Sequence, residues 1–479
     1  MKKQLSALIL AMLALASSAC GDAAVSEEGV ADTVVTTAAA DETAAEEEET
    51  QAPSFADFPS SDLGGYTLRL GDTRQYDIYR FSIREEETGD VLNDAIYRSN
   101  REVEEKLNIT IKSVLYDDPG KLADVIIAGE DAFDIATGQD LRMAELALGG
   151  YMSDISGIKG IDFSADWWPK HSVDAYEING KMLLFSNYMS YFGLSRARVW
   201  YINKSLAADY GLKVPYDSIF DGTWTLDRLI EMINAVYSDV DGNGEKNEGD
   251  IFGLVKTHNY ICMQPSMGID TFAKNKDGQL EFVFDVSKAS AAVEKLYKVF
   301  FESPSVFLIS GDNSPVQQIF ASGQALYYYD SLGMMETFLR DSDVDYGVIC
   351  TPKLDESQPD YIAGYTDYSH GVPITAPDLE KIGACIEAMT ASGYYTVAPA
   401  FIEKALKNKY TYDEQSAKVI DLIMGRMKVE LAYSFSAQMA LAFNNLFNTS
   451  SPGSDLASYY EKNKDKDIAL LERINTLYS

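Results

Sequence analysis

Two hydrophobic segments open the folded part of the chain. They are Tyr66-Thr67-Leu68-Arg69-Leu70 and Phe133-Asp134-Ile135-Ala136-Thr137-Gly138-Gln139-Asp140. Between them, residues 90–107 and 121–128 carry apolar side chains at helical spacing, and residues 109–115 are rich in β-branched side chains. Strands that alternate with helices in this way predict a parallel sheet with helices on both faces. Because such sheets bind ligands beyond the carboxyl ends of their strands, we predict Gln139 and Asp140 as ligand-binding residues.

The α/β pattern continues along the rest of the chain. Residues 225–237 and 287–301 predict helices, and another begins near residue 377. The expected strands are residues 280–284, 325–329, 346–350 and 372–375. After residue 396 the pattern is mainly helical.

The charge of the chain is strongly acidic. Its 479 residues are 46% hydrophobic and carry a net charge of −34. Twelve of the 74 acidic and two of the 40 basic residues fall in residues 1–62, so residues 63–479 still carry −24. We therefore expect no nucleic-acid partner, because such partners require a basic surface. The same charge argues against an anionic ligand as the default, although a local pocket can oppose the overall field.

The N-terminus predicts an exported protein. Residues 1–19 combine two lysines, an apolar stretch too short to span a bilayer and small residues, which together indicate a signal peptide. Cys20 follows Ser17-Ser18-Ala19 and is the predicted lipidation site, although Ser17 stands where lipoproteins favour Leu. The alternative is plain secretion with cleavage near Cys20. Lipidation would anchor the protein to the outer face of the cell membrane, with no other contact to the membrane.

Residues 20–62 predict a disordered acidic linker after the anchor, because acidic side chains repel one another and few apolar residues are present. Three further cysteines remain at positions 262, 350 and 385, an odd number that does not indicate a disulfide framework. They are either buried thiols or one pair and one free thiol.

Catalytic motifs are absent from the sequence. It contains no G-x-S-x-G, P-loop, G-x-G-x-x-G or H-E-x-x-H pattern, and His171, His258 and His370 are too scattered to form a metal motif. Two carboxylates could perform glycosidase chemistry, but 74 acidic residues make any single pair uninformative.

One segment follows the register of an EF-hand loop. Side-chain or backbone oxygens at its ligand positions would come from Asp239, Asp241, Asn243, Glu245, Asn247 and Asp250, with Gly242 and Gly244 inside the loop. Position 12 is Asp250 rather than Glu, and residues 251–255 predict a strand instead of a second helix. The segment therefore predicts either a structural Ca²⁺ site or a surface turn. We expect no other cofactor.

Aromatic and polar residues at strand ends are the remaining candidates for ligand binding. Sugars present C–H faces that stack on aromatic rings and hydroxyl groups that donate to carboxylates and amides. The candidates are Trp168, Tyr188, Tyr191, Tyr260, Tyr329, Asp330, Tyr365, Asp367 and His370. The alternative for each aromatic residue is packing in the core.

Three motifs, in their order along the chain, resemble the extracellular solute-binding proteins of ABC importers, in the carbohydrate class known as family 1. They are Gly222-Thr223-Trp224-Thr225-Leu226-Asp227, Phe320-Ala321-Ser322-Gly323-Gln324-Ala325-Leu326 and Asp345-Tyr346-Gly347-Val348-Ile349-Cys350-Thr351-Pro352. The second motif has Leu326 where the family often has Met. The resemblance extends over nearly all of residues 63–479, and the Cys before an acidic linker agrees with it.

The resemblance implies a two-lobed periplasmic-binding-protein-like (Venus flytrap) fold with a helix-rich second lobe. We assign residues 63–190 and 325–375 to lobe 1, and residues 191–324 and 376–479 to lobe 2. It also implies that a sugar or oligosaccharide binds between the lobes without catalysis, and that a membrane permease receives it. The alternatives are a ligand-sensing interaction protein of the same fold, or a secreted enzyme that acts on glycosides.

Overall fold

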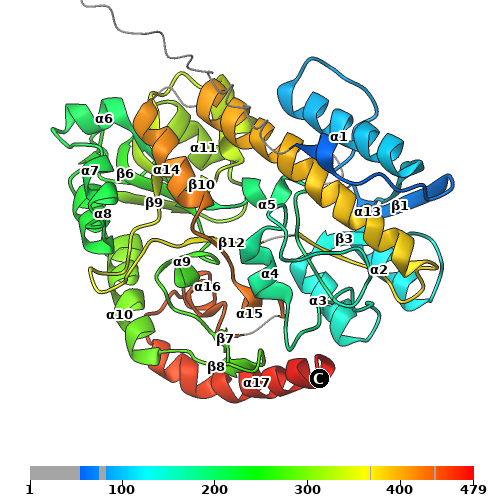
Figure 1. The fold of residues 1–479 in the computed structure, drawn as a ribbon. Helices are drawn as coiled ribbons and strands as arrows, with labels where there is room; N and C mark the ends of the chain where they lie inside the picture. Colours follow the sequence, from blue (N-terminus) through cyan, green and yellow to red (C-terminus); the bar gives the residue numbers. More distant parts are fainter. Residues whose placement is uncertain (1–53, 75–81, 367, 411–412, 436–437) are drawn as a thin grey trace, which may run out of the picture. The chain divides into compact units, whose positions relative to one another are not determined.

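The computed structural model describes residues 54–74, 82–366, 368–410, 413–435 and 438–479. Residues Pro53–Ser479 form one compact unit. Its strands make two main sheets, each with its own helices, and two small two-stranded pairs (Figure 1). The predicted signal peptide, Cys20 and most of the acidic linker lie outside the described residues.

The first sheet has the strand order β13-β3-β1-β2. Its strands are β1 (Tyr66–Thr73), β2 (Ile109–Tyr116), β3 (Ile135–Gln139) and β13 (Tyr368–Gly371). Strands β1, β2 and β3 are parallel, and β13 pairs with β3 in the antiparallel direction. The parallel arrangement predicted from the alternating pattern is therefore confirmed for the first three strands.

Local sequence signals explain the helices between these strands. Helix α1 (Val91–Leu107) begins after Asp90, whose carboxylate accepts the backbone N–H groups of Leu92 and Asn93. It ends at Asn108, which adopts the left-handed conformation with φ of 49° that ends many helices. Helix α2 (Pro119–Ile127) likewise begins after an aspartate and places a proline in its first turn.

The second sheet follows the order β11-β4-β10-β6-β5, and β9 also pairs with β6. Its strands are β4 (Arg198–Asn203), β5 (Tyr237–Ser238), β6 (Ile251–Thr257), β9 (Val306–Ile309), β10 (Ala325–Ser331) and β11 (Tyr346–Cys350). Strand β10 is parallel to β6 and antiparallel to β4, so β10 and β6 end at the edge where β4 begins. Three chain segments that are far apart in sequence therefore meet at one edge.

The remaining elements surround the sheets or connect them. The helices are α3 (Asp140–Leu148), α4 (Lys170–Tyr176), α5 (Phe192–Ser195), α6 (Lys204–Asp209), α7 (Tyr216–Phe220), α8 (Leu226–Asn234), α9 (Met263–Ser266), α10 (Val286–Tyr297), α11 (Ser314–Ala321), α12 (Met334–Thr337), α13 (Leu379–Ser392), α14 (Glu414–Met424), α15 (Leu431–Ser434), α16 (Ala442–Phe447) and α17 (Leu456–Leu477). The pairs are the hairpin β7 (Phe272–Lys274) with β8 (Leu280–Phe282), and the parallel β12 (Ala363–Tyr365) with β14 (Met427–Val429).

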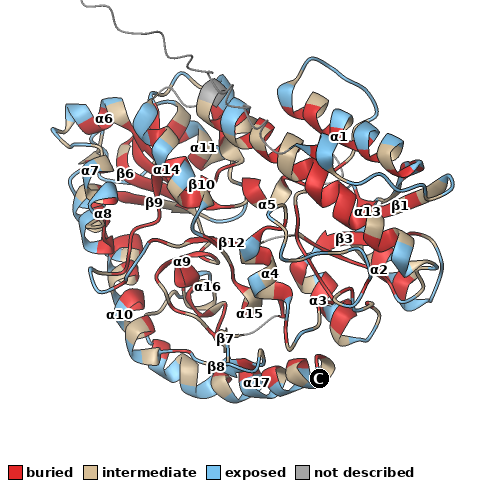
Figure 2. Cartoon of the chain, in the orientation of Figure 1, coloured by how far each residue is buried: buried red, intermediate tan, exposed pale blue. Residues whose placement is uncertain are grey.

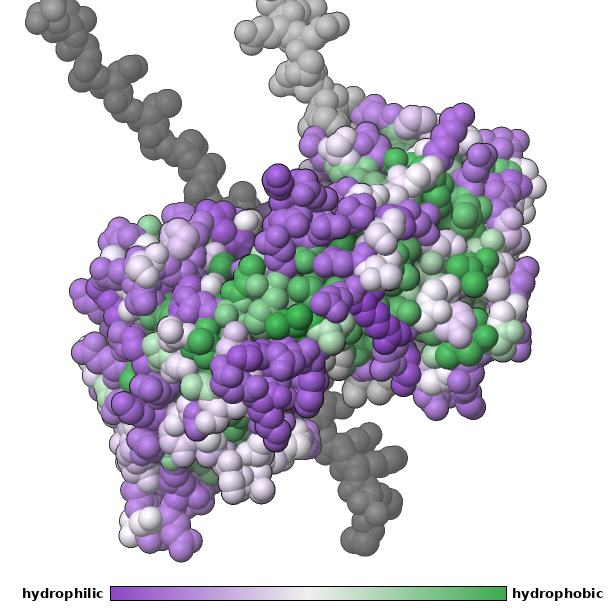
Figure 3. Space-filling view, turned by 90° about the horizontal axis from the view of Figure 1, so that it is seen from below, coloured by the Kyte–Doolittle hydropathy of each residue, from purple (hydrophilic) through white to green (hydrophobic). Residues whose placement is uncertain are grey.

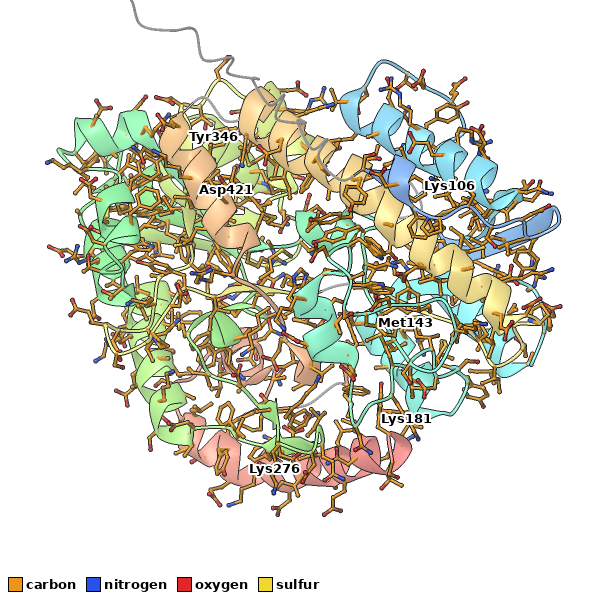
Figure 4. All side chains as sticks on the ribbon, viewed as in Figure 1. Lys106, Met143, Lys181, Lys276, Tyr346 and Asp421 are labelled. Atoms are coloured by element: carbon orange, nitrogen blue, oxygen red, sulfur yellow. The ribbon has the colours of Figure 1, made fainter. Side chains whose placement is uncertain are left out.

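The chain passes between the two sheets several times. Backbone hydrogen bonds join Phe185 to His370 beside the first sheet, and α5 then leads into β4 of the second. Strand β12 leads through residue 366 into β13 of the first sheet. Helix α13 packs on α1, whereas α14, the next α-helix along the chain, packs on β11. The long helix α17 contacts α10, β8 and α3, and Lys276 of the β7–β8 turn lies near it (Figures 1 and 4).

Strand pairing bears on the predicted lobe ranges. Strands β10 and β11 pair with β4, so residues 325–350 lie in the second sheet although the predicted ranges assign them to lobe 1. Helix α13 contacts α1 and β1 of the first sheet although the predicted ranges assign it to lobe 2. The lobe boundaries stay a prediction. We propose that residues 325–350 belong to lobe 2 and that α13 belongs to lobe 1.

The predicted strand at residues 372–375 is wrong. The strand is β13, which ends at Gly371. Beyond it Pro373 forms only an isolated antiparallel bridge with Met152, through backbone bonds from Ser153 to Val372 and from Ile374 to Tyr151, and residues 374–375 turn. The apolar Val372-Pro373-Ile374 run suggested a strand, but Pro373 has no N–H group to give to a sheet. The neighbouring predictions at residues 346–350 and beyond residue 377 are confirmed by β11 and α13.

Burial follows the two sheets. Figure 2 shows buried strands and helices whose outer faces are exposed, and the core includes Trp200, Trp224 and Tyr327. The cysteines at positions 262, 350 and 385 are buried and unpaired. On the face seen in Figure 3, hydrophilic residues cover most of the surface and hydrophobic residues gather near its middle. Among the described residues, no helix is both long and apolar enough to cross a membrane.

Substitution of Gly253 tests the packing of α8 against β6. A Cβ atom at this position would lie 1.9 Å from the carbonyl oxygen of Ile233, so the backbone must move. We expect Gly253→Ala to lower the free energy of unfolding by about 1–3 kcal/mol in urea titrations. Gly157→Ala is the control, because no atom lies within 4 Å of its Cβ position. Equal stability of the two variants would contradict this packing.

The buried carboxyl of Glu430 predicts a pH dependence of stability. Burial first, and then the charge of Asp270, raise the pKa of Glu430 to about 8. Between about pH 4.5 and pH 8 the folded protein therefore holds a proton that the unfolded chain releases, so stability falls as the pH rises.

We expect Glu430→Gln to reduce this fall by up to a few kcal/mol, since one pKa unit corresponds to ~1.4 kcal/mol. The measurement is urea unfolding at pH 5.5 and pH 8. Asp72, whose pKa burial raises to about 7, leaves a residual slope in the variant. The exposed Glu414→Gln is the control, and an unchanged slope in both variants would show that Glu430 is ionised in the folded protein.

Candidate functional site

A small polar pocket lies where the carboxyl ends of strands from both sheets meet. Strand β3 of the first sheet ends at Gln139, and β6 of the second sheet ends at Thr257. The pocket has a volume of about 170 Å³. It is lined by Gln139, Asp140, Leu141, Arg196, Arg198, Asn259, Ile261, Thr366, Tyr368 and Tyr433. We call it the cleft pocket. Its position is the one that α/β sheets commonly use for ligands.

The first sheet contributes the turn from β3 into α3. Gln139 is exposed, whereas Asp140 is buried and begins the helix. The carboxylate of Asp140 accepts a hydrogen bond from the hydroxyl of Tyr176 at 3.1 Å, and the N-terminus of α3 favours its negative charge. Sequence analysis predicted both residues at a ligand site, and the structure brings them together in the cleft pocket.

The second sheet contributes a buried ion pair. Arg198 begins β4 and its Nη1 donates to Oδ1 of Asp330 on β10 at 3.0 Å. Their side chains are 8% and 10% exposed, so solvent screens the pair weakly. The hydroxyl of Tyr328 also donates to Asp330. This pair fixes the position of Arg198 in the pocket wall.

A buried lysine holds the loop that carries Asn259. Lys256 at the end of β6 is 1% exposed, and its Nζ donates to the carbonyl oxygens of Thr257 and Asn259. The Nζ also lies 3.7 Å from the ring centroid of Tyr260. Burial lowers the pKa of Lys256 well below its usual range. The loop therefore turns at a fixed place, and Asn259 reaches the pocket.

Segments that pass between the sheets complete the pocket. Thr366 directly follows β12, Tyr368 is the first residue of β13, and Tyr433 is part of α15, which packs on α3. The predicted site residue Asp367 lies between them but outside the described residues. Because these segments join both sheets, movement of one sheet against the other would change the size of the pocket.

Several predicted aromatic residues pack in the core instead. Trp168 is 4% exposed and its Nε1 donates to Glu387 at 2.8 Å. Tyr191 donates its hydroxyl to Glu336, and the ring of Tyr329 lies 4.8 Å from that of Trp200. None of the three predicted residues lines the cleft pocket. The predicted Asp330 acts through Arg198, behind the pocket wall.

The remaining predicted residues lie near the cleft pocket without lining it. Tyr260 is fully buried, although its neighbours Asn259 and Ile261 line the pocket. Tyr365 is also buried and its ring contacts that of His171 edge-on at 5.5 Å. The Nδ1 atom of His370 lies 2.8 Å from the hydroxyl of Thr137, and burial lowers the pKa of His370 to about 4.

Tyr188 lines a separate pocket. This pocket has a volume of about 450 Å³ and includes Tyr394 and Tyr395. A larger cavity of about 770 Å³ lies between α4, the β7–β8 hairpin and β14. Several of its charged residues form ion pairs, among them Arg426 with Asp360 and Lys428 with Asp270. Neither cavity shares a lining residue with the cleft pocket.

Sequence reasoning missed most of the cleft pocket. The missed residues are Leu141, Arg196, Arg198, Asn259, Ile261, Thr366, Tyr368 and Tyr433. A usable signal was present in Arg196-Ala197-Arg198, because two closely spaced arginines ahead of a strand are unusual in so acidic a chain. Alternation was a second signal, since the neighbours of the chosen Tyr260, Tyr365 and Asp367 line the pocket.

The loop at residues 239–250 brings three carboxylates together. Oxygens of Asp239, Asp241 and Asp250 lie within 4.8 Å of one another. Asp250 is fully buried and accepts the N–H groups of Val240 and Asn247, which closes the loop. Among the described residues this is the single group of His, Cys, Asp or Glu with such spacing.

Comparison with known proteins identifies the family. A model of the bacterial extracellular solute-binding protein family matches residues 100–396, which is more than half of the chain. No curated protein sequence matches the chain.

Solved structures show the same fold. The ABC substrate-binding protein Lmo0181 from Listeria monocytogenes, in complex with cycloalternan, has a TM-score of 0.54 at 14% identity, over 85% of this chain and 99% of that one. The GacH receptor of Streptomyces glaucescens has a TM-score of 0.55 at 12% identity, over 84% and 99%. Maltose-bound MalE3 of T. maritima has a TM-score of 0.53 at 13% identity, over 84% and 100%.

The family match and the shared architecture agree with the cleft pocket between two sheets. The chain therefore belongs to the bacterial extracellular solute-binding proteins, and its fold is the two-lobed α/β fold of periplasmic binding proteins.

Proposed function

We propose that this protein is the lipid-anchored substrate-binding subunit of an ABC importer and that it binds a sugar or oligosaccharide. The observation that carries the proposal is the cleft pocket at the meeting of the two sheets. Its lining offers the side-chain amides of Gln139 and Asn259, the hydroxyl of Thr366 and the rings of Tyr368 and Tyr433. Amides and hydroxyls pair with sugar hydroxyls, and aromatic rings cover sugar C–H faces.

The similar structures support a carbohydrate as the ligand. They were solved with cycloalternan, acarbose and maltose, respectively. At about 170 Å³ the cleft pocket is below the ~300 Å³ at which small-molecule pockets usually begin. A ligand of several rings therefore requires the lobes to open, and closure around it would present one recognisable shape to a permease.

The chemistry of the pocket supports binding without catalysis. Glycoside hydrolysis usually needs two carboxyl groups about 5 to 9.5 Å apart across the bond. Among the described lining residues, Asp140 is the single carboxylate, and Tyr176 already donates to it. This composition favours a binding protein over the glycoside-active enzyme.

The anchor and location belong to the same proposal. Residues 1–19 would be removed during export, and lipid on Cys20 would hold the protein at the outer face of the cell membrane. The acidic residues 20–62 would then act as a spacer. A sensor of the same fold would use the same pocket and would differ in its membrane partner.

Removal of two polar or aromatic pocket contacts tests ligand binding. We expect isothermal titration to show binding of at least one mono- or oligosaccharide, and small-angle scattering to show a smaller radius of gyration with it. Asn259→Ala and Tyr433→Ala should each weaken binding about five- to 100-fold, because each removes a hydrogen bond or a stacking surface.

Asn234→Ala is the matched control, because this exposed residue lies at the end of α8 and outside the pocket. Its affinity should equal that of the unmodified protein. Equal affinity in all variants would place the ligand elsewhere, and release of reducing ends from a glycan would overturn binding without catalysis.

We also propose that the loop at residues 239–250 binds Ca²⁺. The three convergent carboxylates and the glycines inside the loop support this. We expect titration of chelator-treated protein with Ca²⁺ to release or absorb heat, and Asp241→Asn to weaken binding at least tenfold. Asp227→Asn, an exposed aspartate paired with Lys295, is the control. No heat with the unmodified protein would show that the loop is a turn without metal.

A further inference from the structure

Arg196 lines the cleft pocket and forms no ion pair with the described part of the chain. It follows α5, lines the pocket, and its guanidinium lies 5.6 Å from the ring centroid of Phe192. No hydrogen bond or ion pair joins this guanidinium to any residue of the described ranges. Arginine stays protonated in proteins and carries five N–H donors. The pocket therefore contains a positive charge whose N–H donors bind none of the described residues and can bind a ligand.

The neighbouring arginine is different. Arg198 stands two residues later and is neutralised by Asp330 at 3.0 Å. That pair explains why β4 has an arginine at its first position, since a single buried charge would be costly. No structural pair of this kind explains Arg196. A guanidinium that rests on an aromatic ring and faces a pocket is typical of a site that recognises an anion.

Among the described residues that line the pocket, no other titratable group forms an ion pair with Arg196. Asp330 attracts its charge from behind the wall but pairs with Arg198, which repels it. Asp140 is the single carboxylate among the described lining residues, and it is held by the hydroxyl of Tyr176 and by the N-terminus of α3. No ion pair links it to Arg196 within 4.0 Å. Burial raises the pKa of Tyr433, so its phenol is neutral at physiological pH. A carboxylate or another oxyacid group on the ligand would supply the missing partner.

We propose that the ligand is an acidic carbohydrate whose anionic group binds Arg196. This inference rests on the proposed function and specifies its substrate class. Arg196 binds the anionic group through two parallel N–H donors, while Gln139, Asn259 and Thr366 bind hydroxyl groups of the same sugar. A planar carboxylate, as in a uronic acid, matches the guanidinium fork best, and phosphate and sulfate esters share its chemistry.

The site opposes the charge of the rest of the protein. Residues 63–479 carry −24, so an anion approaches against a repulsive field. Salt screens that distant repulsion more than it screens the contact with Arg196. Affinity for an acidic sugar should therefore depend weakly on ionic strength, whereas a sugar attracted only by surface lysines would be lost as salt rises.

Matched pairs of sugars test the inference. Glucuronic acid with glucose, galacturonic acid with galactose, and glucose 6-phosphate with glucose differ by one anionic group, and short oligomers of the uronic acids extend the panel. Isothermal titration should show an acidic member bound at least tenfold more tightly than its neutral partner. The carboxylate and phosphate pairs separate the two sources of the negative charge.

Substitution of Arg196 assigns this preference to one residue. Arg196→Gln should weaken binding of the acidic sugar about ten- to 100-fold, and leave the affinity for its neutral partner unchanged within threefold. Arg196→Lys should restore part of the preference, because it keeps the charge but loses the fork. Arg101→Gln on α1 is the control, since that arginine is exposed and paired with Glu104. Circular dichroism and the melting temperature confirm folding of each variant.

The outcomes separate this inference from the proposed function. Equal affinity for acidic and neutral partners, or an unchanged preference in Arg196→Gln, would overturn the acidic ligand and leave carbohydrate binding intact. Absence of any response to the whole panel and its oligomers would overturn both. If Arg196→Gln loses the preference for the acidic sugar and Arg101→Gln keeps it, the anionic group is assigned to Arg196.

Discussion

The ion pair between Arg198 and Asp330 is the interaction on which the cleft pocket depends. It joins the first residue of β4 to the end of β10 in a place that solvent hardly reaches. Loss of either partner would leave an unpaired buried charge, which costs several kcal/mol. Because β4 enters the sheet directly after α5, the same pair sets where Arg196 lies. The pocket is thus built on an electrostatic contact within one sheet, and the other sheet supplies Gln139 and Asp140.

The parts that the sequence predicted best are local. Periodicity and caps located β1, α1, β2, α2 and β3, since each depends on residues close together in the chain. The rule that parallel sheets bind ligands beyond the carboxyl ends of their strands pointed to Gln139 and Asp140, which lie at the end of β3; their role in binding stays a prediction. The strand predicted at residues 372–375 failed because its three apolar residues resemble a strand, whereas the pairing with β3 is made by the more polar residues 368–371.

The parts that it missed depend on contacts between distant segments. Residues 198 and 330 meet only because β4 and β10 are antiparallel neighbours. Local sequence patterns do not predict which strands pair. Aromatic enrichment pointed to Trp168, Tyr191 and Tyr329, but their rings fill the core and their polar atoms, where bonded, bind other protein groups. A tryptophan or tyrosine side chain can pack in a core or stack on a sugar equally well. Only burial, known after folding, separates these two uses.

The net charge of the protein and the charge inside its pocket affect different properties. The acidic surface governs solubility and long-range encounters, which extend about one Debye length in salt. Specificity is decided by groups that touch the ligand, where water is largely excluded and a single unpaired guanidinium outweighs many distant carboxylates. Some surface cations pair with nearby acids, as Arg101 does with Glu104, and others face only water. Arg196 differs from these surface cations in its place: it lines the cleft pocket and forms no ion pair with the part of the chain that the structure describes, which favours an anionic partner on the ligand.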